Sequence, residues 1–253
     1  MNSTPKTTRA GKASDKMDDT VRTFFLAALI ALGIRAFVFE PFNIPSSSMV
    51  PGLLVGDYLF VSKYSYGYSS LSSLFGLLPV SGRFLGSEPK RGDVIVFKNP
   101  VTPSVDYIKR LVGLPGDTIQ VKNGLLFING VAVDRRKLAE PIVQKYIKPN
   151  PSVVDYTETF PDGNEHIIRE EGDDRTLDDT EVFTVPAGHY FGMGDNRDNS
   201  MDSRTKYVGY IPADNLVGRA EVLFFSLDDG AKFWQIWNWP TSVRWDRLFM
   251  KIK

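Results

Sequence analysis

The sequence contains no cysteine and only two histidines, His166 and His189, among its 253 residues. The absence of cysteine excludes disulfides, thiolate metal sites and cysteine nucleophiles. The scarcity of histidine excludes histidine-rich metal sites and leaves a serine–histidine triad only two candidate bases. An excess of charge is also lacking, because 30 lysines and arginines balance 30 acidic residues. The net charge therefore gives no indication of a nucleic-acid partner.

Long apolar runs are scarce, and the only one lies at residues 21–39. Its length is close to the roughly 20 residues that cross a bilayer as a helix. Arg22 and Arg35 lie near its ends, where long basic side chains can reach the headgroups. A cleavable secretory signal and a buried core helix are the alternatives, but a poor cleavage site follows the run and its centre is not amphipathic. We expect an uncleaved, single transmembrane helix.

The residues that precede this run predict its orientation. Basic side chains are frequent there and favour the cytoplasmic side of a membrane. Residues 1–20 are therefore expected to form a cytoplasmic segment, and residues 40–253 an extracytoplasmic domain. The basic residues are Lys6, Arg9, Lys12, Lys16 and Arg22.

The remainder of the chain predicts a mostly β, hairpin-rich antiparallel domain. Short segments rich in β-branched and aromatic residues alternate with turn signals. Asn-Gly pairs at residues 123–124 and 129–130 are strong hairpin signals. No long amphipathic helix and no tandem repeat is evident. The expected strands are residues 55–61, 93–98, 107–112, 118–121, 125–128, 131–133, 181–185, 190–192 and 220–225.

Two stretches resemble insertions into this domain. Residues 64–89 are rich in serine, glycine and aromatic residues and are interpreted as a mobile loop that could touch the membrane. Residues 140–180 are polar and acidic and are interpreted as a variable outer lobe. The C-terminal tail contains all four tryptophans near basic residues, so packing on the core and packing on lipid are both open.

The serine triplet Ser46, Ser47 and Ser48 lies between two prolines, just after the apolar run. In an extended strand, Ser46 and Ser48 would face one side and Ser47 the other. Two hydroxyls on one face suit acyl transfer, since one can attack and the other can donate to the oxyanion. A solvated serine-rich linker is the alternative.

A lysine can activate a serine if burial keeps its amine neutral. Lys109 lies in the apolar segment DYIKRLVGLPGD, where an exposed strand lysine is the alternative. A third segment, GMGDNRDNSMDSR at residues 192–204, has glycines without the lysine of a phosphate loop. It also lacks the glutamate that closes a calcium loop, so a tightly hydrogen-bonded turn is the general interpretation.

Taken together and in order, these segments resemble the type I signal peptidases, membrane-bound proteases with a serine–lysine dyad. The similarity rests on IPSSSMVPGLLVGDYLFV, RGDVIVFKNP, DYIKRLVGLPGD and MGDNRDNSMDSR, which fall between Ile44 and Arg204. The loops and the tail carry no comparable motif. Gly52 departs from the family pattern, which has threonine there, so that a hydroxyl is lost and backbone freedom gained.

The resemblance implies a role for each matching residue. Ser48 would be the nucleophile, Lys109 the general base, and Ser46 an oxyanion donor beside the backbone N–H of Ser48. Ser200 would hydrogen-bond and orient the lysine, and Ser47 would be a spacer whose replacement matters least. The supporting residues implied are Asp195, Asp202 and Arg204. Our candidates for lining shallow substrate pockets are Ile44, Met49, Tyr107 and Ile108.

The implied activity is removal of signal peptides from exported preproteins after small residues, as in Ala-x-Ala. The expected partners are preprotein signal peptides and membrane lipid, with contact to the secretion machinery left open. No metal and no cofactor is expected, and replacing both histidines should leave catalysis nearly intact. The expected location is the bacterial inner membrane, with the catalytic domain on the periplasmic side.

Three functions other than general signal-peptide removal are alternatives. One is a serine–lysine peptidase dedicated to a single substrate, and another is a non-catalytic, membrane-anchored β domain. The third is a self-cleaving repressor, which uses a similar dyad but is soluble and carries a DNA-binding module. The apolar run and the absence of a helix-turn-helix signal in this sequence argue against it.

Overall fold

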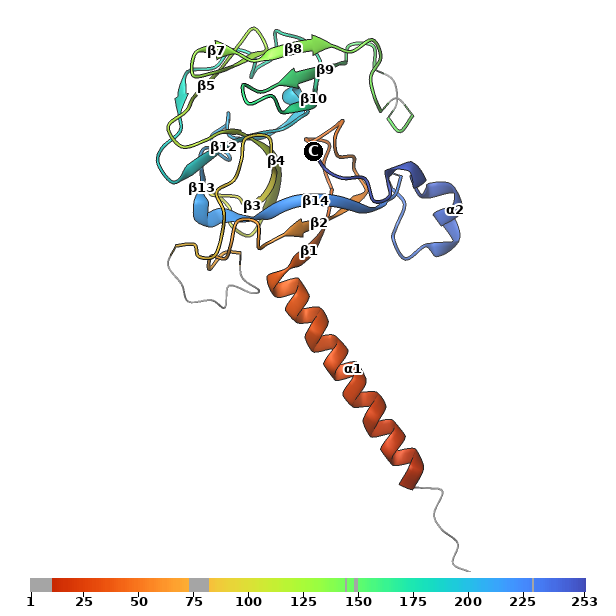
Figure 1. Ribbon diagram of the computed structural model, residues 1–253. Helices are drawn as coiled ribbons and strands as arrows, with labels where there is room; N and C mark the ends of the chain where they lie inside the picture. Colours follow the sequence, from red (N-terminus) through yellow and green to blue (C-terminus); the bar gives the residue numbers. More distant parts are fainter. Residues whose placement is uncertain (1–10, 73–81, 144, 148–149, 229) are drawn as a thin grey trace, which may run out of the picture.

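The computed structural model describes residues 11–72, 82–143, 145–147, 150–228 and 230–253. The helix α1 (Gly11–Phe37) projects from one end of a β-rich body (Figure 1). Its stretch Asp19–Phe37 has a mean hydropathy of 1.6 and is 6% buried. Within the described part of the chain, it is the one helix long and apolar enough to cross a membrane. The helix begins at Gly11, before the expected start of the apolar run at residue 21.

The largest sheet has seven antiparallel strands and lies next to α1 (Figure 1). The long strand β14 lies between β2 and β3, and β4 lies between β3 and β12. In β2, burial alternates through its first half, as expected for a strand with one face on a core. Across this sheet the strands are β1 (Phe39–Asn43), β2 (Asp57–Ser62), β14 (Leu216–Ser226), β3 (Val94–Lys98), β4 (Asp106–Gly113), β12 (His189–Met193) and β13 (Ile211–Pro212).

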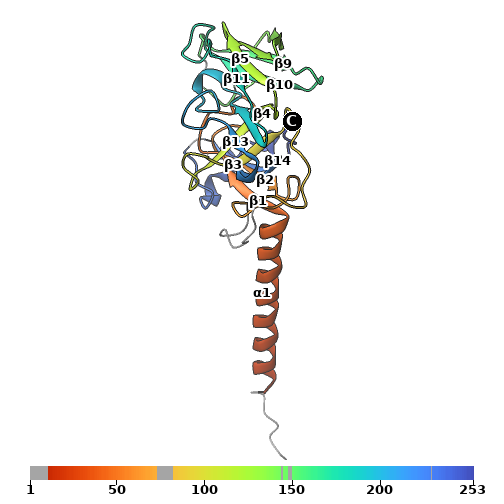
Figure 2. The same cartoon turned by 90° about the vertical axis from the view of Figure 1, so that its left-hand side faces the viewer.

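Two smaller sheets lie at the end remote from α1, as the turned view in Figure 2 also shows. One contains β11 (Phe183–Thr184), β5 (Thr118–Lys122), β6 (Leu125–Ile128) and β7 (Val131–Ala132), and the other contains β10 (Glu165–Glu170), β9 (Val154–Thr159) and β8 (Asp134–Lys137). The predicted hairpin turns are confirmed. Asn123 and Asn129 have φ of 47° and 53°, each followed by a glycine with positive φ, as type I′ turns require.

Short helical turns complete the elements. They are the 3₁₀ turns η2 (Arg197–Asn199), η3 (Ala213–Asn215), η4 (Ile236–Asn238) and η5 (Trp245–Arg247), and the helix α2 (Trp239–Ser242).

Two apolar clusters form most of the core. One joins β1, β2, β3 and β14, and it includes Ile44 and Met49 on either side of the serine triplet. The other joins the β5–β6 hairpin to β12, where Ile119 and Phe191 are fully buried. The serine triplet is therefore held between buried apolar anchors, which ties its position to the rigid sheet.

Each expected strand is present, and the fold is mostly antiparallel β as predicted. Five strands were not expected: β1, β8, β9, β10 and β13. Strand β1 contains Pro41 and lies at the edge of the sheet, where a missing N–H is tolerated. Strands β9 and β10 contain many polar residues, and their sequences VDYTET and EHIIRE lack the apolar alternation that marks a strand.

The described parts of residues 64–89, which we expect to form a mobile loop, make hydrogen bonds to one another and to the body of the domain. Tyr66 is 2% exposed and donates to the carboxylate of Asp93 at 2.8 Å. Arg83 donates to the carbonyls of Tyr66 and Gly67 at 3.0 and 2.8 Å. Residues 73–81 of the expected loop lie outside the described residues.

The C-terminal tail packs on the core in part. The ring of Trp239 lies 4.9 Å from that of Phe225 on β14. Arg247 is buried and forms an ion pair with Asp57 at 2.6 Å. The other tryptophans face outward, with Trp234, Trp237 and Trp245 exposed by 67%, 70% and 59%.

Candidate active site

The serine triplet lies in a turn that follows β1. Its expected extended conformation is wrong, because β1 ends at Asn43 and the backbone N–H of Val50 donates to the carbonyl of Ser47 at 3.1 Å. The side-chain pairing nevertheless holds, since the hydroxyl oxygens of Ser46 and Ser48 are 3.4 Å apart. The turn thus brings together the two hydroxyls that an extended strand would have placed on one face.

Strand β4 brings Lys109 against this turn. The Nζ atom of Lys109 donates to Ser48 Oγ at 2.7 Å and to the carbonyl of Ile108 at 2.8 Å. Lys109 is 3% exposed and Ser48 is 8% exposed. Gly192 on β12 makes this packing possible, because a Cβ there would lie 3.1 Å from the Cβ of Lys109.

Burial lowers the pKa of Lys109 to about 8, although the nearby carboxylates of Asp202 and Asp195 act in the opposite direction. An amine with such a pKa is neutral in a substantial fraction of molecules near neutral pH. A neutral amine 2.7 Å from a hydroxyl can accept its proton. The pair therefore has the chemistry of a nucleophile and its base.

Two groups at or near Ser48 can donate hydrogen bonds to a developing oxyanion. The hydroxyl of Ser46 is one, and the backbone N–H of Ser48 is the other, with no hydrogen-bond partner among the described residues. Preorganised donors of this kind stabilise the negative charge of a tetrahedral intermediate.

Ser200 lies beside the dyad but does not form the expected hydrogen bond. Its hydroxyl is buried and has no partner among the described residues, because the Lys109 amine is directed to Ser48 and Ile108. Ser200 approaches Gly194 so closely that a Cβ on Gly194 would lie 2.2 Å from the Ser200 hydroxyl. In this structure Ser200 therefore contributes to the site by packing and not by a hydrogen bond to Lys109.

Two buried ion pairs hold the loop that carries Ser200. Asp202 binds Arg204 at 2.9 Å and accepts the backbone N–H of Gly194 at 3.0 Å. Burial would raise the pKa of Asp202, but Arg204 and these backbone donors outweigh it and lower the pKa. Asp195 accepts two hydrogen bonds from the guanidinium of Arg110, the neighbour of Lys109, at 2.7 and 2.8 Å. Asp195, Asp202 and Arg204 thus all take part in ion pairs of this loop, and their supporting roles stay predictions.

Two asparagines that the sequence analysis did not single out fasten the serine turn to this loop. Asn196 donates its backbone N–H to the carbonyl of Ser48 at 3.1 Å and its amide to that of Ser47 at 3.0 Å. Asn199 donates to the Ser47 hydroxyl at 2.9 Å. Both asparagines lie in the GDNRDNS motif, but nothing in the motif itself indicates which distant turn they hold.

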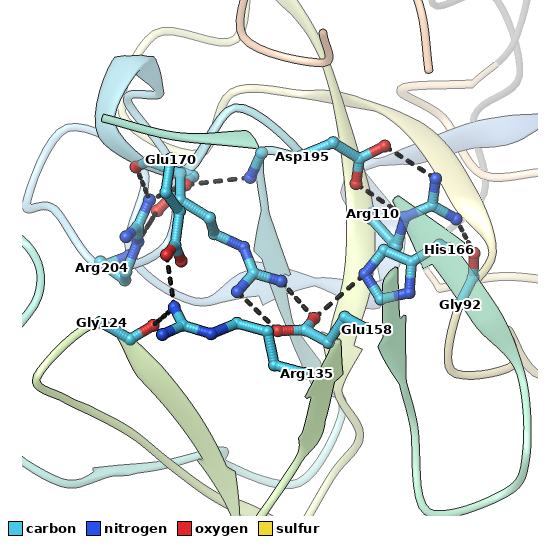
Figure 3. Close-up of polar contacts among 12 residues, drawn as sticks. Gly92, Arg110, Gly124, Arg135, Glu158, His166, Glu170, Asp195 and Arg204 are labelled. Carbon is cyan, nitrogen blue, oxygen red and sulfur yellow. Dashed lines mark hydrogen bonds and ion pairs between the residues drawn. The ribbon is translucent and has the colours of Figure 1, made fainter. Parts of the chain in front are cut away.

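A buried network of charges supports the loop from the side of β9 and β10 (Figure 3). Arg197 forms a two-pronged ion pair with Glu158 on β9, and Glu158 also contacts His166 at 3.1 Å. Arg169 on β10 donates its backbone N–H to the carbonyl of Asp195 at 2.8 Å. The β9–β10 hairpin within residues 140–180 thus contacts the loop of the site directly.

Both histidines lie outside the groove that contains the dyad. That groove has a volume of about 810 Å³, and Ser48, Lys109 and Ser200 line it. Tyr107 and Ile108 line it too, whereas Ile44 and Met49 are 2% and 0% exposed and belong to the core beneath. Among the described residues, no group of three or more side chains could hold a metal ion.

The first half of β4 presents an unpaired backbone edge to this groove. Residues 106–109 pair with β3 on one side, while β12 pairs with β4 only from Arg110 onward. An extended peptide can add to such an edge as a further strand.

A serine hydroxyl held against a buried lysine amine of lowered pKa, next to an open strand edge, has the groups that a serine hydrolase acting on peptides needs. Residues 17–225 match the family model described as signal peptidase, peptidase S26. The chain belongs to this family and is a peptidase, which argues against a non-catalytic β domain.

Relatives with the same description cover nearly all of the chain. A signal peptidase I of Rickettsia canadensis (strain McKiel) is 38% identical over 244 residues, 92% of this chain and 86% of that protein. One from Rickettsia typhi (strain ATCC VR-144 / Wilmington) is 38% identical over 251 residues, 96% of this chain and 90% of that protein. A crystal structure of a signal peptidase I from Enterococcus faecalis V583 is 29% identical and covers 53% of this chain and 97% of that chain, with a TM-score of 0.31.

Proposed function

We propose that this chain removes N-terminal signal peptides from exported preproteins, with Ser48 as nucleophile and Lys109 as general base. The observation that carries this proposal is the 2.7 Å contact between Lys109 Nζ and Ser48 Oγ in a buried site. The family membership supports a signal-peptide substrate, and the open edge of β4 supports an extended one.

The reaction proceeds in two stages. Neutral Lys109 takes the proton of Ser48 as its Oγ attacks the scissile carbonyl, and Ser46 with the Ser48 N–H stabilises the oxyanion. The protonated amine then gives its proton to the leaving amino group. Water, deprotonated by the same lysine, hydrolyses the acyl-enzyme and frees Ser48.

The substrate preference we propose is for small residues at positions −1 and −3. Tyr107 and Ile108 line the groove itself, and the core residues Ile44 and Met49 lie beneath it. Such a groove offers apolar contact without a deep pocket, which suits alanine side chains at −1 and −3.

We also propose that α1 anchors the chain in a membrane, with residues 1–20 cytoplasmic and the β domain outside. Strand β1 begins two residues after α1 ends and leads to the serine turn, so the site lies close to the bilayer surface. Membrane lipid is thus a second partner. Protease protection of the chain in inverted and right-side-out vesicles tests this orientation, and digestion of the β domain only in inverted vesicles would contradict it.

The function is tested by cleavage of a purified preprotein with the full-length chain in detergent. Wild type should release the signal peptide, whereas Ser48→Ala and Lys109→Arg should not, because each removes one member of the dyad. The exposed residues Ser152 and Lys122 supply matched controls, so Ser152→Ala and Lys122→Arg should retain wild-type cleavage. Cleavage by folded Ser48→Ala at the wild-type rate would contradict the proposal.

A further inference from the structure

A second hollow adjoins the groove of the dyad on the far side of Ser47. It has a volume of about 590 Å³. It shares Ser47, Glu171 and Asn199 with the groove, so the two adjoin along these residues. Its outer wall comes from the connection between β8 and β9. The apolar residues that line it are Val50, Pro141, Val143, Ile147, Pro151 and Val153.

The direction of the substrate indicates which part of it reaches this hollow. In a preprotein the apolar stretch of the signal peptide precedes the cleavage site. On the proposed function, that stretch comes from the membrane and its last residues lie beside β1 and the start of β4. The residues after the scissile bond then leave on the side away from α1, where the β8–β9 connection lies (Figure 1).

The register of an extended peptide selects one side chain for the hollow. Side chains alternate along a strand, so the second residue after the scissile bond faces the protein like the residue at −1. The first residue after the bond faces the opposite way. The side chain at position +2 is therefore the one that can enter the hollow.

The chemistry of the hollow favours an apolar side chain. Val50 and Val143 are both 2% exposed and form an apolar cluster against which the half-buried Ile147 packs. The one buried cation in the wall, Arg169, is already paired with Asp155 at 2.7 Å. Glu171 also lines the hollow, and its carboxylate lies 3.7 Å from the guanidinium of Arg175. An acidic side chain would lose hydration there, would find no free cation among the described lining residues, and would be repelled by Glu171.

We propose that this hollow is a subsite for the mature part of the substrate and accepts an apolar side chain at position +2. The proposal rests on the proposed function and assigns a specificity-determining role to Ile147. An apolar side chain gains from burial in the hollow, whereas an acidic one does not. We therefore expect kcat/KM to be about tenfold or more higher for a substrate with an apolar residue at +2 than for one with an acidic residue there.

The test uses three preproteins that differ only at position +2, with alanine, leucine or aspartate, and the full-length chain in detergent. Wild type should cleave the leucine substrate about tenfold faster than the aspartate substrate in kcat/KM. Ile147→Ser should bring this ratio close to one by slowing cleavage of the leucine substrate. Ile147→Phe narrows the hollow and should lower kcat/KM for the leucine substrate relative to the alanine substrate.

The matched control is Ile142→Ser, a change in the same connection. Ile142 is 52% exposed and does not line the hollow, so this variant should keep the wild-type ratio. A wild-type ratio near one, or equal ratios for Ile142→Ser and Ile147→Ser, would overturn the subsite. Failure of wild type to cleave even the alanine substrate would instead overturn the proposed function, and the subsite with it.

Discussion

The loss of activity on the acid side of the pH profile (the acid limb) should result from protonation of Lys109. Burial lowers the pKa of its amine from 10.5 to about 8, and only the neutral amine can take the proton of Ser48. Since kcat/KM reports the free enzyme, it should rise with pH below about 8 and level off above that value.

The structure sets the size of this effect. With a pKa of about 8, about one molecule in ten has a neutral amine at pH 7, whereas a pKa of 10.5 would leave about one in three thousand. Burial therefore increases the competent fraction at pH 7 by roughly 300-fold, which corresponds to roughly 3 kcal/mol. The same burial lowers the stability of the folded state, because it disfavours the charged ammonium form of the amine.

The assay is kcat/KM for preprotein cleavage between about pH 6 and pH 10, a range that brackets the lowered pKa, with thermal unfolding measured over the same range. For wild type, log kcat/KM should rise with pH with a slope of one below the pKa of Lys109. The Lys109→Arg variant should be inactive throughout, because its guanidinium stays protonated. His189→Gln should keep the wild-type profile. A limb near the ordinary pKa of histidine, about 6.5, or an active Lys109→Arg, would refute the lysine base.

Three further variants test the surroundings of the dyad. Ser46→Ala should lower kcat by about 10²–10³ with a smaller effect on KM, as steady-state kinetics can show, because it removes one oxyanion donor. Asn196→Ala should lower kcat by roughly 10²-fold without moving the acid limb, since it removes the amide hydrogen bond to the Ser47 carbonyl next to Ser48 but leaves Lys109 buried. Glu158→Gln should cost about 3–5 kcal/mol in denaturant unfolding, because it leaves a buried arginine without its carboxylate, whereas the exposed Glu165→Gln should be nearly neutral.

The sequence was sufficient for the parts of the fold whose signals are local. The Asn-Gly turns predicted the β5–β6–β7 meander, because a type I′ turn requires positive φ at two successive residues. Enrichment in β-branched and aromatic residues located five strands of the main sheet, namely β2, β3, β4, β12 and β14, but not β1 and β13. It did not locate β9 and β10, whose buried side chains include Glu158 and Arg169, because burial of charge depends on partners that are distant in sequence.

The same distinction applies to the site. The three motifs named the residues of the dyad, but the alternation argument for the serine pair used a strand that is absent. The hydroxyls of Ser46 and Ser48 meet because a turn curls them together, and Asn196 on a distant loop fastens that turn. Replacing both histidines is expected to leave catalysis nearly intact, and neither histidine lines the groove of the dyad. His166 is buried against Glu158 in the network that holds the loop, so its replacement should affect folding more than that of His189.

The serine turn therefore depends on two supports of different kind. On one side Met49 is buried in the apolar core, which fixes the backbone next to Ser48. On the other side, Asn196 holds the Ser48 carbonyl, and the neighbouring Asp195 is itself held by Arg110 beside Lys109. Ser48 and Lys109 are thus linked through one polar chain of contacts as well as through their own hydrogen bond. Loss of any link in that chain should reduce the rate by disturbing geometry, while the pKa of Lys109, which burial determines, should change little.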